Sequence, residues 1–303
     1  MDRRTVLKLG MGMTAAFAGG GSRGALAQQA PAQAPAPKPF ATRKLSDTVY
    51  LFRYGGHQSI FVITPDGVIA TDPIGYLRPP AVRTYIDEIR KVTQAPIKYV
   101  VYSHHHYDHI AGGRPFKELG ATFVAHKNAK TRLEALKYPD AVIPDEVVDD
   151  ERVLELGGVR MELRFVGRNH SDNSLVMLLP KDKLLFTVDF IPIETVQFRD
   201  MPDGYLPDWF DSLDRVIALP GWDQMVPGHP YAGGRFGTRD DVRNLKQYMT
   251  ELSDAVKQAA DQGKCFDTAI KEVKLPKYEK WGAYEQFLPG NVQRFCEFWG
   301  RGY

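Results

Sequence analysis

The segment SHHHYDH, residues 103–109, concentrates more metal-binding side chains than any other stretch of the chain. Four of the eight histidines stand in it, together with one aspartate. It continues a β-branched and aromatic run, IKYVVYS, that predicts a buried strand of a parallel sheet. Because side chains alternate along a strand, His104 and His106 are expected to point one way and His105 the other.

These residue types at this spacing can form a metal site. His104 and His106 stand two residues apart, and Asp108 and His109 follow where the chain turns. Neutral imidazole and carboxylate are good ligands for zinc and similar divalent ions. The alternative is a polar loop with solvated histidines. A buried strand that brought several titratable groups together without compensation would be unstable, which favours the metal site.

Three further candidate ligands stand at the ends of other predicted strands. His170 follows one strand, Asp189 ends a second and His229 follows a third. A single histidine or aspartate in such a position is usually a turn or capping residue. Taken with the histidine segment, however, the three residues indicate one metal centre assembled from several strand ends.

Two runs of strands and helices carry these candidates. The first run is expected to contain strands between 48 and 72, a helix at 80–92, the strand at 97–103, a strand at 121–126 and a helix at 127–136. The second is expected to contain strands between 152 and 189, a helix at 208–218, a strand at 224–228 and a long amphipathic helix starting at a Thr238–Asp241 capping box. This order predicts an α/β fold in which two sheets pack together with helices outside. Residues 40–303 are assigned to one domain with a helical C-terminal extension.

The N-terminus has the pattern of an export signal. Residues 1–27 combine a charged start, a mild apolar stretch and an Ala-Leu-Ala cleavage site. Arg3-Arg4 resembles a twin-arginine signal, and residues 28–39 are a Pro/Ala-rich linker. We therefore expect a periplasmic or secreted protein. The apolar stretch is too short to span a membrane comfortably, so no stable membrane anchor is expected after cleavage.

The net charge of the chain limits the kinds of partner that it can be expected to bind. The formal charge of the chain is +2 and becomes −1 once the four basic residues and one aspartate of residues 1–27 are removed. This balance gives no reason to expect a nucleic-acid partner, and a small-molecule substrate is expected instead.

The chain has two cysteines, Cys265 and Cys296. They could form a disulfide outside the cytoplasm or stand as two separate buried thiols, and the sequence leaves both possibilities open.

The complete pattern resembles the metallo-β-lactamase superfamily. The H-x-H-x-D-H motif of that family is matched by His104, His106, Asp108 and His109, and the later order His, Asp, His is matched by His170, Asp189 and His229. The resemblance covers roughly residues 45–230. It implies an αββα sandwich, with two mixed β-sheets packed face to face, helices outside and metals at the edge of the sheets.

The resemblance also implies a role for each candidate. His104, His106 and His170 would hold one metal, Asp108, His109 and His229 would hold a second, and Asp189 would bridge the two. The expected cofactor is zinc, two ions per chain, with iron or manganese as other possibilities. Such ions make bound water nucleophilic near neutral pH.

Four residues near the motif have different expected roles. Asp108 would be catalytic, orienting the nucleophile and passing a proton to the leaving group. Asp72 resembles the family's buried supporting aspartate. His57 is a possible substrate-pocket residue, whereas His126, which ends a strand, is expected to be structural. The long segment 190–210 could be a substrate rim or a packed surface loop.

The ligand set favours a hydrolase. Asp189 stands where some antibiotic-degrading members of the family carry cysteine, and this pattern resembles glyoxalase II and lactonase members. We therefore expect an exported hydrolase of a small ester, lactone, thioester or β-lactam. Two alternatives remain: a mononuclear iron persulfide dioxygenase, which shares much of the motif, and a non-catalytic metal-binding accessory protein.

Overall fold

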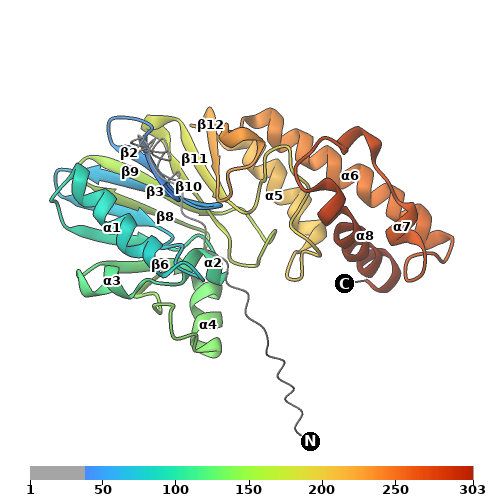
Figure 1. The fold of residues 1–303 in the computed structure, drawn as a ribbon, viewed down its shortest axis with the longest axis horizontal. Coiled ribbons are helices and arrows are strands. Elements are labelled where there is room, and N and C mark those ends of the chain that lie inside the picture. Colours follow the sequence, from blue (N-terminus) through green and yellow to red (C-terminus); the bar gives the residue numbers. More distant parts are fainter. Residues whose placement is uncertain (1–37, 303) are drawn as a thin grey trace, which may run out of the picture. The chain divides into compact units, whose positions relative to one another are not determined.

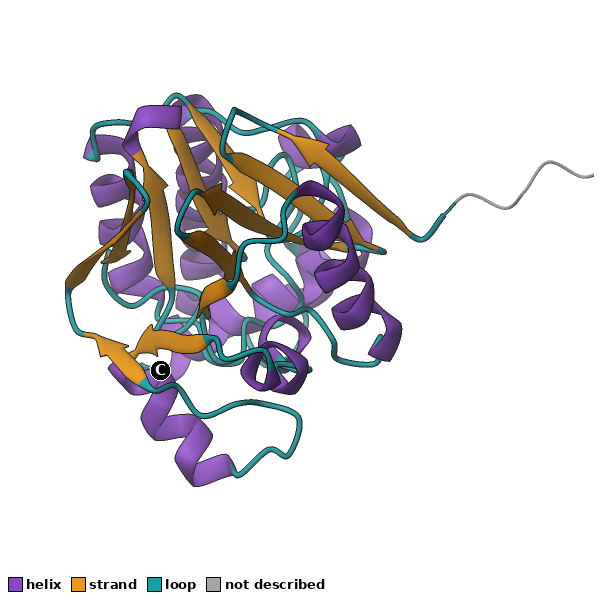
Figure 2. Ribbon diagram, turned by 90° about the vertical axis from the view of Figure 1, so that its left-hand side faces the viewer, coloured by secondary structure: helices purple, strands orange, loops and turns teal. Residues whose placement is uncertain are grey.

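Two β-sheets packed face to face form the centre of the computed structural model, which describes residues 38–302. The predicted signal, residues 1–27, and the linker as far as Pro37 lie outside the described residues. The facing sides of the sheets share an apolar core that includes Ile60 and Val101 from one sheet and Met177 and Phe186 from the other. Figure 2 shows these strands in the middle with helices around them.

The first sheet has seven strands in the order of the chain. They are β1 (Phe40–Lys44), β2 (Val49–Tyr54), β3 (His57–Thr64), β4 (Gly67–Thr71), β5 (Ile97–Val101), β6 (Thr122–His126) and β7 (Glu146–Val148). The pairs from β1 to β4 are antiparallel, and the pairs from β4 to β7 are parallel. The sequence did not predict the two edge strands of this sheet, β1 and β7, because each is short and shows no clear apolar pattern.

The second sheet has five strands in the order β12-β11-β10-β9-β8. They are β8 (Glu151–Leu156), β9 (Val159–Phe165), β10 (Leu175–Leu179), β11 (Leu184–Val188) and β12 (Gln224–Pro227). Only the pair of β11 with β12 is parallel. β10 and β11 are buried along their whole length, as expected for strands covered on both faces.

Helices cover the outer face of each sheet (Figure 1). The first sheet carries α1 (Pro79–Val92), α3 (Arg114–Glu118) and α4 (Lys127–Leu136), and the one-turn helix α2 (Tyr107–Ile110) follows β5. On the side of the second sheet lie α5 (Leu206–Ala218) and α6 (Arg239–Asp261), while α8 (Tyr284–Arg301) packs against α6 and α7 (Ala269–Glu272) packs against α8. The αββα sandwich expected from the sequence is confirmed. α6 begins at the predicted capping box, in which the Thr238 amide donates to the Asp241 carboxylate at 2.8 Å.

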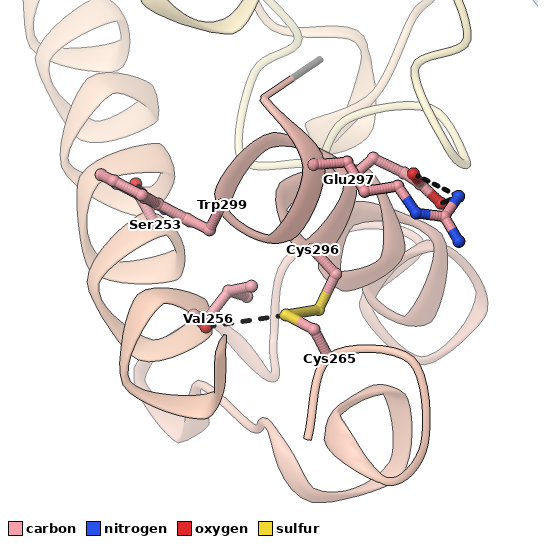
Figure 3. Close-up of a disulfide and its surroundings, with 7 residues drawn as sticks. Ser253, Val256, Cys265, Cys296, Glu297 and Trp299 are labelled. Carbon is pink, nitrogen blue, oxygen red and sulfur yellow. Dashed lines mark hydrogen bonds and ion pairs between the residues drawn. A yellow bond between two sulfur atoms is a disulfide. The ribbon is translucent and has the colours of Figure 1, made fainter. Parts of the chain in front are cut away.

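A disulfide fastens the C-terminal helices to one another. Cys265, in the segment after α6, is bonded to Cys296 of α8, which decides between the two possibilities left open for these cysteines (Figure 3). The Trp299 indole also donates to the Ser253 hydroxyl of α6 at 3.0 Å. Among residues 38–302, no helix combines the length and apolar character needed to cross a membrane.

Candidate metal centre

The seven candidate ligands all stand in segments that follow strands: five lie in loops, and Asp108 and His109 lie in the one-turn helix α2. β5 ends at Val101, so His104 to His106 lie in a loop rather than at the end of a longer strand. The prediction that strand alternation separates His105 from its neighbours was therefore made for the wrong reason. His105 does lie outside the two groups of four described below, but with His106 and Asp203 it forms a third, smaller group of possible ligands, and it also lines the cavity.

The first group consists of His104, His106, His170 and Asp189, whose ligand atoms all lie within 4.8 Å of one another. His106 Nδ1 is 3.0 Å from His170 Nε2. Oδ2 of Asp189 is 3.9 Å from His104 Nε2 and 3.8 Å from His170 Nε2. Three imidazole nitrogens and one carboxylate oxygen thus face a common point.

The second group consists of His57, Asp108, His109 and His229, again with ligand atoms within 4.8 Å. Oδ2 of Asp108 is 3.4 Å from His109 Nε2 and 3.6 Å from His229 Nε2. His57 Nε2 is nearer still, at 3.1 Å from the same oxygen. The residue expected only to line the pocket therefore lies among the candidate ligands.

Asp189 lies between the two groups. Besides its contacts with the first group, its Oδ2 is 3.0 Å from His109 Nε2 and its Oδ1 is 3.3 Å from His229 Nε2. Val188, the residue before Asp189, has a φ of 51°. This conformation is rare for a β-branched residue, and strained residues of this kind cluster at functional sites. Gly228 leaves the necessary room, since a Cβ there would lie 2.7 Å from Asp189 Oδ1.

The donor atoms suit divalent metal ions. His104 Nε2 is buried and has no hydrogen-bond partner among the described residues. Because an unpaired buried polar atom costs free energy, this nitrogen is expected to bind a cation. Burial lowers the pKa of His104 well below its ordinary value and that of His170 to about 4. Both rings are thus neutral near pH 7, with a lone pair available for a cation. The set of histidines and carboxylates fits zinc or a similar ion.

The second group has a different electrostatic character. Burial alone would lower the pKa of His109 and His229, but the nearby carboxylates, Asp189 foremost, outweigh it. They raise the pKa of His109 well above its ordinary value and that of His229 to about 9. Burial would raise the pKa of Asp189, and the charge of His109 instead holds it well below the ordinary range. These groups behave as a charge-balanced cluster of imidazolium and carboxylate.

Asp72 contacts His109 of the second group through the ring nitrogen that faces away from the other ligands. It is fully buried at the end of β4, and its Oδ1 accepts a hydrogen bond from the Ser103 amide at 2.8 Å. Its Oδ2 lies 3.5 Å from His109 Nδ1. The carboxylate therefore orients His109 so that Nε2 faces the second group. His126, by contrast, accepts a hydrogen bond from the Asn128 amide at the start of α4, outside either group.

Asp203 is a site residue that the sequence did not reveal. It stands in the segment 190–210, which was considered only as a possible rim, and its Oδ2 lies 2.9 Å from His106 Nε2. Burial would raise the pKa of Asp203, but the hydrogen bond to His106 and the surrounding histidines lower it. No local pattern marks this aspartate, because its partner is 97 positions away in the chain.

A cavity of about 720 Å³ opens above the two groups. Leu77, Leu136 and Phe198 line it and are 82%, 55% and 54% exposed. Arg78 is the one lysine or arginine in the described lining. Its guanidinium donates to the carbonyl oxygens of Ile74 and Asp108, at 3.1 and 2.8 Å, and thus ties the β4–α1 loop to the histidine segment. The entrance of the cavity is therefore mainly apolar, and the histidines and aspartates of the two groups lie at its base.

Comparisons with known proteins agree with this architecture. Residues 54–229 match the family model of the metallo-beta-lactamase superfamily. The chain is 24% identical over 191 residues to 2,4-dinitroanisole O-demethylase subunit alpha of Nocardioides sp. (strain JS1661), a match that covers 62% of this chain and 57% of that protein. It is 28% identical over 163 residues to hydroxyacylglutathione hydrolase of Rhizobium meliloti (strain 1021), covering 52% of this chain and 59% of that one.

A solved structure has the same fold. The metallo-beta-lactamase from Pontibacter korlensis superposes with a TM-score of 0.57 at 22% sequence identity, covering 69% of this chain and 99% of that one. The C-terminal helices α6 to α8 lie beyond the residues that match the family model. The family match, the two-sheet sandwich and the histidine–aspartate groups at strand ends lead to one conclusion: the chain belongs to the metallo-β-lactamase superfamily.

Proposed function

We propose that this protein is a dinuclear zinc hydrolase of a small ester, lactone, thioester or β-lactam. The observation that carries the proposal is the position of Asp189, whose two carboxylate oxygens face residues of both four-membered groups. His104, His106 and His170 would hold the first ion, and Asp108, His109 and His229 the second. Two divalent ions supply Lewis acidity and a water that is nucleophilic near neutral pH.

The chain's own residues provide the acid–base chemistry. Asp108 is partly exposed to the cavity, and its Oδ2 lies among the imidazole nitrogens of His57, His109 and His229. A carboxylate in this position can orient an attacking water and hand its proton to a leaving group. His57 has a pKa lowered to about 4 by burial, so its neutral ring can donate a hydrogen bond that fixes the Asp108 carboxylate.

The cavity mouth favours a substrate with an apolar portion next to the cleaved bond. Three exposed large side chains from separate segments gather around it: Leu77 and Phe198 from loops, and Leu136 from the C-terminal end of α4. Exposed apolar clusters of this kind usually contact a ligand. Arg78 already donates to two backbone carbonyls, which argues against a substrate that depends on several anionic contacts.

Metal analysis and a substrate panel test the proposal. Metal content is measured by mass spectrometry on purified protein, followed by hydrolysis of lactones, aryl esters, a hydroxyacylglutathione thioester, β-lactams and 2,4-dinitroanisole. We expect two zinc ions per chain and turnover of at least one ester, lactone, thioester or β-lactam. One iron per chain with sulfur-dependent oxygen uptake would establish the persulfide dioxygenase instead. Stable metal binding without turnover of any substrate would favour the accessory protein.

Export to the periplasm or beyond is also part of the proposal. The N-terminal pattern with Arg3-Arg4 supports it, and the Cys265–Cys296 disulfide is consistent with an oxidising compartment. Replacing both arginines with lysine is expected to leave precursor inside the cell, measured by fractionation and immunoblotting. Normal export of the double variant would point to the general secretory route.

A further inference from the structure

His106 is held at both of its ring nitrogens. Nδ1 faces His170 Nε2 at 3.0 Å, within the first group, and Nε2 faces Asp203 Oδ2 at 2.9 Å. A carboxylate accepts hydrogen bonds and cannot donate one when ionised, so Asp203 keeps the ring proton on Nε2. The lone pair then stays on Nδ1, the nitrogen that faces the first group.

Asp203 belongs to the loop that joins β11 to α5, and the C-terminal helix α8 holds this loop. The side-chain amide of Asn291 donates to the carbonyl oxygens of Gln197 and Arg199, at 2.9 and 2.6 Å. Arg294, one turn further along α8, donates to the carbonyl oxygen of Gly204 at 2.7 Å. The backbone on both sides of Asp203 is therefore bonded to the same helix.

Asn291 is well suited to fix the loop because its own position is fixed. It is fully buried, and its Oδ1 accepts a hydrogen bond from the Tyr248 hydroxyl of α6 at 2.8 Å. A buried amide that satisfies groups on two other segments specifies their arrangement, since any shift leaves polar atoms unpaired. α6 and α8 both lie outside residues 54–229, the part of the chain that matches the family model.

We propose that Asp203 is a positioning residue for the metal ligand His106, and that the C-terminal helices hold Asp203 in place through Asn291. The extension is thus a structural part of the metal centre, although it contributes no ligand. The inference rests on the proposed metal centre and does not depend on the substrate.

The first experiment measures metal affinity and ring tautomer. Asp203→Ala and Asp203→Asn are made in a His229→Ala background, which weakens the second site, and the full-length protein is titrated with Zn²⁺ against a competing chelator. Asp203→Ala is expected to weaken first-site affinity about 10- to 100-fold, with a smaller loss for Asp203→Asn, whose amide oxygen can still accept the hydrogen bond. Nitrogen-15 NMR of the metal-free protein should show the His106 proton moving partly from Nε2 to Nδ1 in Asp203→Ala.

Asp200→Ala is the matched control. Asp200 lies in the same loop, also lines the cavity and carries the same charge, but it is exposed and makes no described hydrogen bond to a histidine. We expect its first-site affinity to stay within about twofold of the parent. An equal loss in Asp200→Ala and Asp203→Ala would show that only long-range charge matters and would overturn the proposal, as would an unchanged tautomer and affinity in Asp203→Ala.

A second experiment tests the link to α8. Asn291→Ala is expected to weaken first-site affinity when Asp203 is present and to cause no further loss in an Asp203→Ala background, because both changes act through one contact. Independent, additive losses would remove Asn291 from the proposal. Asn291→Ser replaces it should Asn291→Ala fail to fold, since serine also lacks the paired donors.

The two proposals can fail separately. If no substrate is hydrolysed but Asp203→Ala loses zinc affinity, the proposed hydrolase falls and the positioning role stands. If hydrolysis is found and Asp203→Ala binds zinc normally, the proposed hydrolase stands and the positioning role of Asp203 is overturned.

Discussion

Oδ2 of Asp189 lies 3.0 Å from Nε2 of His109, although the two residues are 80 positions apart and follow strands of different sheets. The same carboxylate faces the first group of candidate ligands, so its charge serves both. An ionised carboxylate buried in this way needs a cationic partner.

Asp189→Asn tests this shared role, because it keeps the shape of the side chain and removes the charge. The variant should fold, bind the second zinc ion at least about 10-fold more weakly and lose most of the hydrolytic rate. Metal content and kcat are the measurements. His105→Ala, next to the first group but outside both groups of four, is expected to keep two ions and near-normal activity. Two fully bound ions in an active Asp189→Asn variant would remove Asp189 from the bridging position.

The two ions should differ in the protons that they displace at pH 7. His104 and His170 have a lowered pKa and are already neutral, whereas His109 and His229 have a raised pKa and hold protons. Binding of the second ion must displace those protons, so its affinity should rise with pH up to about 9. The expected slope is about tenfold per pH unit for each displaced proton, with a flatter dependence for the first ion. Calorimetry in buffers of different ionisation enthalpy measures this, and equal proton release by both ions would contradict it.

Leu77 should contribute to substrate binding and not to stability. It is 82% exposed at the cavity mouth and has a φ of 53°, a conformation that costs a leucine about 1 kcal/mol or more. Leu77→Gly relaxes the backbone, so thermal unfolding should show no loss of stability. KM for aryl esters with longer acyl chains should rise about 5- to 10-fold with kcat little changed. Leu119→Ala, an exposed leucine away from the cavity, is the control. An unchanged KM in Leu77→Gly would exclude contact with the substrate.

The Cys265–Cys296 disulfide should stabilise the C-terminal helices. It closes a loop with a sequence separation of 31 residues. Replacing both cysteines with serine is expected to lower the free energy of unfolding by about 2–4 kcal/mol, measured in urea. A reducing agent should destabilise the parent protein and leave the double-serine variant unaffected. Equal sensitivity of both to reduction would show that the disulfide is not the cause.

The sequence alone determined the sandwich fold and the candidate ligand set. Metal chemistry restricts the residue types, and strand ends restrict their places, so the H-x-H-x-D-H spacing and three later strand-end residues could be recognised without coordinates. Helix α4 was predicted at its observed bounds, directly after the predicted strand at 121–126. The edge strands β1 and β7 were not predicted because each is short and its sequence shows no clear apolar alternation.

Only the tertiary structure decided which distant residues complete the centre. His57 meets Asp108 across 51 positions and Asp203 meets His106 across 97, and neither pair has a spacing that a local pattern could reveal. The packing of α6 and α8 likewise decides two further contacts. It brings Cys265 next to Cys296, and it places Asn291 where its amide can donate hydrogen bonds to the β11–α5 loop. Hydrogen bonds and disulfides require contact to within a few ångströms, and between loops that contact is set by the packing of the sheets and helices that carry them.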